Sequence, residues 1–390
     1  MAGLIKKVSD SEIGMKIKEK LYPKYDLNPV TGSRLVIANA IKRFRDCENK
    51  KNRYQIKTEI QAYKKFWTCY PYDYFVCNLY RNDNPVTEDE IINYIPYFFW
   101  YYLYLPHYTS YKLSTIIGNK IATEQFFQSL GIHQPKTLFR IINGNLYSPE
   151  MGRCTFHQIQ QEIIDNSFEK IFVKPAWGGG SKGIYIFHKN ESGFYTTHQN
   201  ITFNENFLSN IGRTSDYIVQ PGIVQDQGIA RIYPGSVNTC RLITENIDGI
   251  SRVVCGVLRI GRGKNEVDNA SAGGLFLKID ITNGRVGNHA MSYEYEKFSA
   301  HPDTHFVFNN FTIPQWDEIR KFSTESADRL PFFSHLGWDI ALTVNGPLAI
   351  ETNLNPGIEV LQIPYGGLRE AFGITDPDYF WKNPGKRLTK

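Results

Sequence analysis

Three oxygen-bearing side chains near the C-terminal end have the types and spacing of a divalent-cation site. Asp339 lies in one apolar run, and Glu351 and Asn353 lie at the end of the next. Between the two runs is Asn345-Gly346, a dipeptide typical of tight β-turns because both residues tolerate positive φ. The sequence therefore predicts a β-hairpin with two carboxylates towards its open end.

The register of this hairpin decides whether the carboxylates share a face. For strands 338–343 and 347–352, a two-residue turn pairs Asp339 with Thr352 and sends Asp339 and Glu351 to opposite faces. A three-residue loop or a β-bulge pairs Asp339 with Glu351 instead and puts them on one face, with the amide of the third residue beside them. That arrangement suits Mg²⁺, which prefers carboxylates and substrate phosphates. The other register leaves only a polar hairpin edge.

A second candidate site is the glycine-rich stretch after the predicted strand 170–175. Gly178, Gly180 and Gly183 match G-x-G-x-x-G, but a second strand follows them rather than a helix. The dinucleotide fingerprint needs that helix and therefore does not apply. Strand, glycine loop and strand predict a flap whose backbone N–H groups cover phosphates, with Lys174 as a fixed positive charge. The alternative is a glycine-rich surface hairpin.

Three further features are candidates for binding or function. Arg241 lies among apolar neighbours in the predicted strand 236–244, so it either pairs with a structural carboxylate or faces an anion in a cleft. The segment 261–274 is too long for a tight hairpin, and loops of this length are usually functional or mobile. Lys120 begins a predicted helix that ends near Gly131. At the start of this helix Lys120 could bind an anion, or it could be an ordinary solvent-exposed lysine.

Composition limits the classes of protein and partner. The 390 residues carry a net charge of +5 and 42% hydrophobic residues, which is typical of a globular protein of two or three lobes. The mild positive charge favours anionic ligands such as nucleotides, but there is no basic stripe and we expect no nucleic-acid partner. The most apolar run, 91–105, contains Pro96 and is shorter than the roughly 20 residues of a membrane span.

The N-terminal third is predicted to be helical. A helix is expected at 33–45 and a capping box at 87–90, before an aromatic helix at 91–105, and Asp10 begins a further candidate helix. The six cysteines lack metal-site spacing and no signal peptide is recognised, so we expect reduced thiols in the cytoplasm. The oligomeric state does not follow from the sequence.

Five segments, taken together in their order along the chain, resemble the ATP-grasp superfamily of carboxylate–amine ligases, over roughly residues 115–365. They are most similar to its sugar-transfer-associated branch, which is linked to polysaccharide biosynthesis. The segments are Lys120 before GIHQP, FVKPAWGGGSKG at 172–183, IVQPG at 218–222, SVNTCR at 236–241 and GWDIAL…AIETNLNPG at 337–357.

The resemblance implies an α+β fold, the ATP-grasp fold, in which two α+β lobes enclose ATP. It implies a small lobe with the glycine-rich lid at 115–222 and a large lobe with the metal site at 223–390, after a helical N-terminal domain at 1–114. The implied cofactors are ATP and Mg²⁺.

The resemblance also implies the roles of individual residues. The implied Mg²⁺ ligands are Asp339, Glu351 and Asn353, and the implied catalytic residues are Lys174 and Arg241, with Arg241 at the γ-phosphate. The implied nucleotide-binding residues are Lys120, Lys174, Gly178, Gly179, Gly180, Ser181, Val219, Gln220, Asp226 and Arg241.

The implied reaction is phosphorylation of a carboxylate by ATP, followed by attack of an amine on the acyl phosphate. The sequence departs from the family at Gly337, where many members carry an arginine that steadies the tetrahedral intermediate; Arg259 or Arg262 would replace it. The hinge also lacks an acidic residue, which leaves Gln220 or Asp226 for the ribose.

Three functions are therefore compared. The first is an ATP- and Mg²⁺-dependent ligase for a small-molecule carboxylate and an amine or hydroxyl acceptor, such as an amino acid or a sugar acid of surface polysaccharides. The second is an ATP-grasp phosphotransferase, a kinase, which the missing arginine at Gly337 favours. The third is a non-catalytic nucleotide-binding protein, which the retained carboxylates disfavour.

Overall fold

The computed structural model describes residues 29–384, except 70, 85, 180–182, 192, 194, 270 and 271. The chain divides into two compact units, Met1–Thr109 with Gly357–Lys390, and Ser110–Pro356. We call them the helical unit and the two-sheet unit. Residues 357–390, which the sequence places in the large lobe, group with the helical unit here. The three-domain division itself stays a prediction.

In its described part the helical unit consists of helices joined by turns and loops, with one isolated β-bridge between Lys50 and Arg81. The capping box at 87–90 is present, because Thr87 Oγ1 accepts a hydrogen bond from the Glu90 N–H and the Glu90 carboxylate accepts from the Thr87 N–H. The candidate helix start at Asp10 lies outside the described residues. The helices are α3 (Pro29–Asp46), α4 (Arg53–Trp67), α5 (Tyr72–Val76), α6 (Glu88–Ile91), α7 (Tyr97–Phe99), a π-helix (Trp100–Tyr104), α8 (Leu105–Tyr108), α15 (Glu359–Tyr365) and α16 (Pro377–Lys382).

The prediction of one continuous aromatic helix over 91–105 is wrong, because the segment is divided into several short helices. Helix α6 ends before Pro96, a new helix starts after it, and the chain passes through Pro106 by way of the π-helix. A proline removes one N–H and clashes with the preceding turn, so a wider turn accommodates it. The segment is nevertheless a buried aromatic core: the rings of Trp67 and Phe99 lie 4.8 Å apart.

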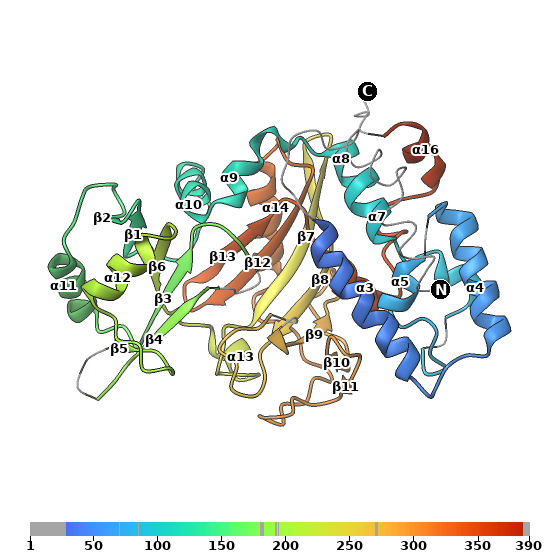
Figure 1. The fold of residues 1–390 in the computed structure, drawn as a ribbon, viewed down its shortest axis with the longest axis horizontal. Helices are drawn as coiled ribbons and strands as arrows, with labels where there is room; N and C mark the ends of the chain where they lie inside the picture. Colours follow the sequence, from blue (N-terminus) through green and yellow to red (C-terminus); the bar gives the residue numbers. More distant parts are fainter. Residues whose placement is uncertain are drawn as a thin grey trace. The chain divides into compact units, whose positions relative to one another are not determined.

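The two-sheet unit contains a six-stranded antiparallel sheet in the order β2-β1-β6-β3-β4-β5. Figure 1 shows this sheet in green. Helices α11 and α12 supply Ile159, Ile163, Leu208 and Ile211 to the core that the sheet buries. The elements are β1 (Phe139–Ile142), β2 (Asn145–Tyr147), α11 (Phe156–Asn166), β3 (Lys170–Pro175), β4 (Tyr185–Lys189), β5 (Tyr195–Thr196), α12 (Glu205–Gly212) and β6 (Tyr217–Pro221).

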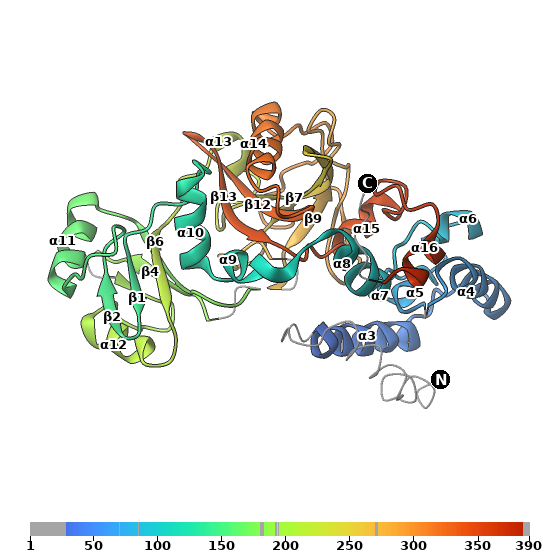
Figure 2. The same cartoon turned by 90° about the horizontal axis from the view of Figure 1, so that it is seen from above.

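The second sheet has seven strands in the order β11-β10-β9-β8-β7-β12-β13. Helix α14 packs along one face of it, as Figure 2 shows. The strands are β7 (Thr239–Ile247), β8 (Ile250–Ile260), β9 (Leu275–Lys278), β10 (Ala290–Met291), β11 (Lys297–Phe298), β12 (His335–Thr343) and β13 (Gly346–Asn353); the helices are α9 (Ser114–Gly118), α10 (Lys120–Ser129), α13 (Gln227–Ala230) and α14 (Trp316–Asp328), with a 3-10 turn at Tyr111–Leu113.

Period-two alternation in this second sheet sorts side chains between a dry face and a polar face. Leu242, Leu258 and Trp338, each from a different strand, are fully buried in the core under α14. The residues next to them in sequence therefore point to the opposite face. The predicted α+β fold with a helical N-terminal region is confirmed. In the described residues, every helix is too short or too polar to span a lipid bilayer.

Candidate functional site

The β12–β13 hairpin places Asp339 directly opposite Glu351. The turn is formed by Val344 and Asn345, because Thr343 pairs with Gly346, so the predicted turn at Asn345-Gly346 is wrong by one residue. From that turn a regular register would pair Asp339 with Ile350. The register shifts by one residue between Asp339 and Ile340. This shift is a β-bulge, one of the alternatives that the sequence allowed, and it puts the two carboxylates on one face.

Asp339 lies between two arginines, one from the adjacent strand β7 and one from β8, the strand beyond it. Arg241 on β7 and Arg259 on β8 each approach Asp339 Oδ1 to 2.9 Å, through Nε and an Nη atom respectively. Both ion pairs end on the same oxygen, which leaves Asp339 Oδ2 as the candidate ligand for a cation. The lone arginine of strand β7 thus pairs with a carboxylate and lies on the polar face of the sheet.

Arg259 continues this ion-pair network to Asp268. Its second Nη atom lies 2.7 Å from Asp268 Oδ1, and Asp268 Oδ2 accepts hydrogen bonds from the backbone N–H and the hydroxyl of Thr239. Burial alone would lower the pKa of Arg259, but Asp339 and Asp268 outweigh it and raise this pKa. Burial raises the pKa of Asp268, against the opposing effects of Arg259 and Thr239. Arg259 is therefore a fixed cation held between two carboxylates.

Lys120 reaches the same face from the first turn of α10. Asn119 caps this helix by accepting hydrogen bonds from the N–H groups of Ile121 and Ala122, which fixes the position of Lys120. The Lys120 ammonium lies 3.6 Å from Glu351 Oε1 and donates to the Gly178 carbonyl over 2.6 Å. The glycine loop thus begins beside the carboxylate pair.

Lys174 at the end of β3 is the second lysine of the site. It donates to Gln220 Oε1 over 3.0 Å and lies 5.5 Å from the centre of the Phe172 ring. Burial lowers the pKa of Lys174 from its ordinary 10.5 to about 8; Glu351 opposes this shift and Lys120 adds to it. A cation this poorly solvated gains most from an anionic ligand.

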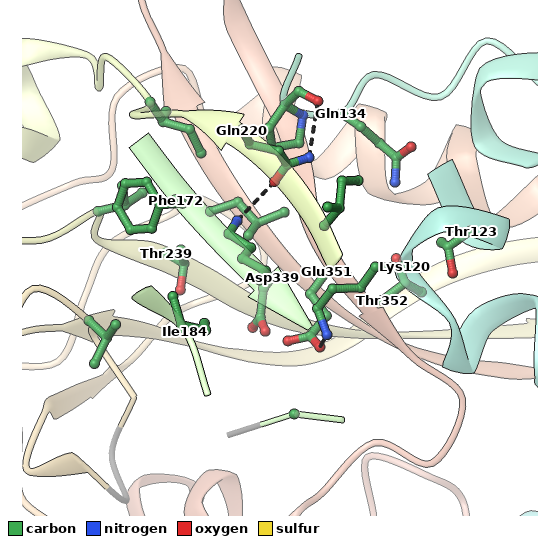
Figure 3. A pocket seen from close by; sticks show the side chains of 18 of the residues that line it. Lys120, Thr123, Gln134, Phe172, Ile184, Gln220, Thr239, Asp339, Glu351 and Thr352 are labelled. Atoms are coloured by element: carbon green, nitrogen blue, oxygen red, sulfur yellow. Dashed lines mark hydrogen bonds and ion pairs between the residues drawn. The ribbon is translucent and has the colours of Figure 1, made fainter. Parts of the chain in front are cut away.

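These groups line one pocket between the two sheets of the unit (Figure 3). Lys120 points at Glu351, and Gln220 points at the Lys174 ammonium across the pocket. Apolar side chains form another part of the wall, and they include Phe172, Ile184, Ile218, Val237 and Ile350. Of the residues predicted from the sequence, the pocket lining contains Lys120, Lys174, Gly178, Gly179, Gln220, Arg259, Asp339 and Glu351.

Five predicted residues that the structure describes are not part of the pocket lining: Arg241, Asn353, Val219, Asp226 and Arg262. Arg241 is nevertheless paired with Asp339, and Asn353 follows Glu351 on β13. Val219 is buried in the middle of the six-stranded sheet, where its carbonyl accepts from the Leu138 N–H. Asp226 caps the short helix α13 by accepting from the Gly228 N–H over 2.8 Å. Arg262 binds the Gly273 carbonyl over 2.6 Å within its own loop. The predicted Gly180 and Ser181 lie outside the described residues.

Gly337 cannot carry the arginine that many family members have there. A Cβ atom at this position would lie 2.9 Å from Pro356 Cβ and 3.4 Å from an Nη atom of Arg241. Arg241 therefore lies beside the space that a side chain at position 337 would need. The glycine at position 337, where many family members have arginine, therefore has a steric basis. The Arg241 side chain still places a guanidinium beside this position.

Sequence reasoning missed Glu266 of the loop 261–274, which lines the pocket together with Asp268 of the same loop. The length of the loop indicated a functional segment, but no pattern within it distinguished the Glu266 carboxylate. Its position depends on a contact with Lys170, which is distant in the sequence, whereas Asp268 contacts Arg259 on the strand just before the loop.

The donor set on this face fits a hard cation. Asp339 and Glu351 offer carboxylate oxygens, and Asn353 lies two residues further along the same side of β13. Asn353 Nδ2 is buried and has no hydrogen-bond partner in the part of the chain that the structure describes. An amide whose N–H₂ is orphaned in this way has room for a further polar ligand beside its oxygen. Carboxylate and amide oxygens are the ligands that Mg²⁺ prefers.

A family model described as sugar-transfer associated ATP-grasp matches residues 102–372. This match confirms the resemblance and the fold that the sequence predicts. No curated protein matches the chain.

Similar solved structures include the ADP complex of N5-carboxyaminoimidazole ribonucleotide synthetase, with 12% identity, a TM-score of 0.37, and coverage of 66% of this chain and 49% of that one. D-alanyl-alanine synthetase A from Vibrio cholerae has 14% identity and a TM-score of 0.38, and the match covers 70% of this chain and 65% of that one. The biotin carboxylase domain of the Hydrogenobacter thermophilus 2-oxoglutarate carboxylase has 12% identity and a TM-score of 0.38, and the match covers 72% of this chain and 48% of that one. The chain thus spans about half to two-thirds of the length of these structures.

Proposed function

The chain belongs to the sugar-transfer associated ATP-grasp family, and on this premise we propose that it is an ATP- and Mg²⁺-dependent ligase that joins a carboxylate to an amine through an acyl phosphate. The observation that carries the proposal is the arrangement around one pocket of two facing carboxylates, Asp339 and Glu351, with two lysines, Lys120 and Lys174. Carboxylates alone would suit many cations, but the added lysines match a polyphosphate bound together with a metal.

In this proposal ATP occupies the pocket between the sheets. The apolar wall that includes Phe172, Ile184 and Ile350 accepts the adenine, and Gln220 supplies polar contacts at its edge. Lys174 and Lys120 bind phosphate oxygens, so Lys120 exchanges its contact with Glu351 for one with the nucleotide. The glycine loop beginning at Gly178 covers the phosphates with backbone N–H groups.

Asp339, Glu351 and Asn353 would hold Mg²⁺. When bound, the ion would neutralise charge on the phosphates and make the γ-phosphorus more electrophilic. Arg241 and Arg259 keep one oxygen of Asp339 occupied and hold the carboxylate in a fixed orientation. Their guanidinium groups also place positive charge where negative charge accumulates during phosphoryl transfer.

The proposed reaction has two steps. A carboxylate oxygen of the substrate attacks the γ-phosphorus of ATP, the bond to the β-phosphate oxygen breaks, and ADP leaves. A neutral amine then attacks the acyl carbon, the bond to the phosphate oxygen breaks, and the amine loses a proton as inorganic phosphate departs. Little side-chain acid–base chemistry is needed, which agrees with the lack of a histidine at the described pocket lining.

The family description supports a proposal for the substrate class. We propose an amino acid or a sugar acid used in surface-polysaccharide assembly as the carboxylate, with an amine or a hydroxyl group as acceptor. The carboxylate would bind near Arg241, because this guanidinium lies beside Gly337, the position of the family arginine.

Gly337 favours a second candidate function. If the tetrahedral intermediate is not stabilised, the reaction ends after phosphorylation, and the protein is an ATP-grasp phosphotransferase that releases a stable phosphorylated product. A non-catalytic nucleotide-binding role would not require the facing pair Asp339 and Glu351.

Turnover of Mg²⁺-ATP with pooled carboxylic acids, with and without hydroxylamine, distinguishes these functions. ADP together with a hydroxamate is the expected result, since hydroxylamine traps an acyl phosphate. ADP with a stable phosphorylated product and no hydroxamate would contradict the ligase and establish the kinase. ATP that binds without any ADP formation across the pool would contradict both enzymatic functions.

A further inference from the structure

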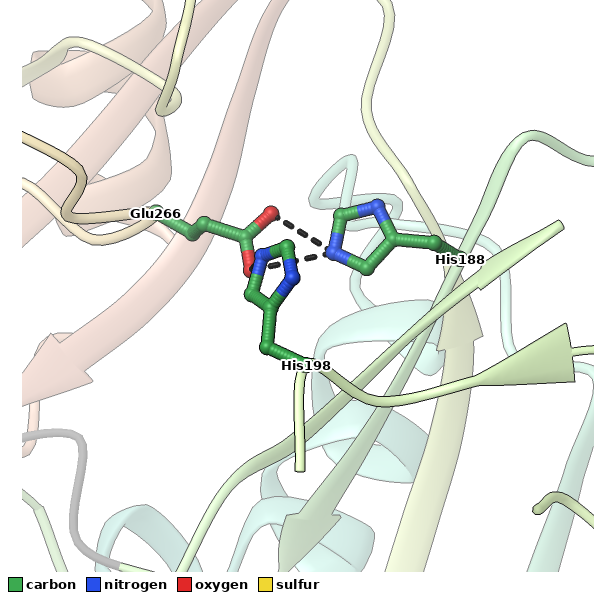
Figure 4. A group of neighbouring side chains, drawn as sticks. All are labelled: His188, His198 and Glu266. Atoms are coloured by element: carbon green, nitrogen blue, oxygen red, sulfur yellow. Dashed lines mark hydrogen bonds and ion pairs between the residues drawn. The ribbon is translucent and has the colours of Figure 1, made fainter. Parts of the chain in front are cut away.

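Two histidines and a glutamate converge outside the proposed Mg²⁺ site (Figure 4). His188 lies on β4 and His198 in the turn that follows β5, while Glu266 belongs to the loop 261–274 after β8. His188 Nε2 lies 2.9 Å from Glu266 Oε1 and 3.0 Å from Oε2, and His198 Nε2 lies 3.1 Å from Oε2. The two imidazole nitrogens and one carboxylate oxygen thus face a common point.

The spacing of these atoms matches ligands that share one metal ion. Zinc bonds of about 2.0–2.2 Å at tetrahedral angles place neighbouring ligand atoms about 3.3–3.6 Å apart. The measured distances of 3.0 and 3.1 Å are within a few tenths of an ångström of the lower end of this range. All three ligand atoms lie within 4.8 Å of one another, and the His198 side chain is 70% exposed, so its ring can turn inwards without repacking a core.

We propose that His188, His198 and Glu266 form a binding site for a transition-metal ion of the Zn²⁺ class. Imidazole nitrogens with a single carboxylate are the ligands of such ions, whereas Mg²⁺ takes oxygen ligands almost exclusively. The site is chemically distinct from the all-oxygen set of Asp339, Glu351 and Asn353. It does not depend on the proposed ligase function.

Lys170 supports this assignment through the other carboxylate oxygen. Its ammonium lies 3.0 Å from Glu266 Oε1, on β3 beside β4. A donor on the second oxygen of a ligating carboxylate orients it, as outer-shell partners of metal sites commonly do. The carboxylate stands between the lysine and the proposed ion, so the two positive charges do not meet directly.

Metal binding here would connect the two sheets of the unit. His188 lies on β4 and His198 in the turn after the edge strand β5 of the six-stranded sheet, and Glu266 is carried by a loop of the seven-stranded one. The next two residues, Val267 and Asp268, line the nucleotide pocket. The ion would therefore fix one wall of the pocket against the strand that follows the glycine loop, while its remaining coordination position is left to water.

Titration of the full chain with Co²⁺ and Zn²⁺ in excess Mg²⁺ tests the site, because Mg²⁺ saturates the oxygen ligands. We expect one equivalent of Co²⁺ to bind with a visible absorption spectrum of nitrogen and oxygen ligation, and Zn²⁺ to displace it. His188→Ala and His198→Ala should each weaken binding at least tenfold. His157→Ala, which removes an exposed histidine on α11, should leave it unchanged.

Three outcomes would overturn the proposal. The first is the absence of Co²⁺ binding in excess Mg²⁺. The second is equal Co²⁺ affinity in the wild type and in both His188→Ala and His198→Ala; His198 is exposed, so this variant is expected to fold. The third is a near-ultraviolet charge-transfer band, because it would assign the ion to cysteine thiolates.

Discussion

Glu351 lies opposite Asp339 because β13 contains one residue more than the regular hairpin register requires. From the turn at Val344-Asn345 that register would place Ile350 opposite Asp339. The bulge places Ile350 on the pocket lining and brings Glu351 into line with the aspartate. A single inserted residue thus creates the carboxylate pair on which the proposed Mg²⁺ site depends.

Glu351→Gln should lower Mg²⁺-dependent ATP turnover by at least about 100-fold, because the amide removes a charged ligand of the proposed ion while keeping its shape. Steady-state ADP formation and thermal unfolding measure activity and fold together. Glu318→Gln, on the exposed face of α14, is the matched control and should keep wild-type turnover. Wild-type activity in Glu351→Gln would contradict the metal assignment.

Gly337→Arg, which introduces the arginine that many family members have, should not raise activity. It should instead lower the free energy of unfolding by about 1–3 kcal/mol, the usual cost of overpacking. Its Cβ would meet Pro356 at 2.9 Å and displace Arg241. Urea unfolding measures the loss. Gly152→Ala is the control, because its nearest neighbour would lie 3.5 Å away. If Gly337→Arg were as stable as the control and more active, the steric explanation for Gly337 would be wrong.

Asp268→Asn should cost about 3–5 kcal/mol of unfolding free energy, because it removes one partner of a buried ion pair and leaves Arg259 with less compensation. The midpoint of urea unfolding reports this directly. Asp317→Asn removes an exposed partner of Arg320 and should cost less than about 1 kcal/mol. Similar midpoints for the two variants would show that the Arg259–Asp268 pair contributes little to stability.

ATP binding should weaken as the pH rises through about 8. Burial lowers the pKa of Lys174 to about 8, so the side chain is a cation below this pH and becomes neutral above it. A neutral amine loses its charge-assisted bond to phosphate. Nucleotide affinity measured between pH 6.5 and 9.5 should show this decline.

Lys174→Arg provides the control for this pH profile, since arginine keeps its charge throughout the range. The decline near pH 8 should disappear in this variant even if its affinity is lower overall. An unchanged profile in Lys174→Arg would assign the titration to another group.

The sequence predicted most elements of the two-sheet unit because their signals are local. Strand β3 covers the predicted strand 170–175, and the alternation along β7 placed Arg241 apart from its apolar neighbours. The fold class and the family followed from the ordered motifs. The roles assigned to individual site residues stay predictions, even where the structure brings those residues together.

The remaining features depend on contacts that no local pattern encodes. The hairpin turn is one residue earlier than Asn345-Gly346 suggests, because Thr343 Oγ1 accepts from the Asn345 N–H and donates to the Gly346 carbonyl. Pro347 is tolerated in β13 because this is an edge strand of the sheet. The link from Asp268 through Arg259 to Asp339 is seen only in the structure.

Calorimetric titration with a non-hydrolysable ATP analogue tests the central claim most directly, because it needs no knowledge of the carboxylate substrate. The wild type should bind the analogue at least about tenfold more tightly with Mg²⁺ than with EDTA, equivalent to about 1.4 kcal/mol, and Glu351→Gln should lose this difference. Equal affinity with and without Mg²⁺ in the wild type, or no binding at all, would contradict a metal-assisted nucleotide site at Asp339 and Glu351.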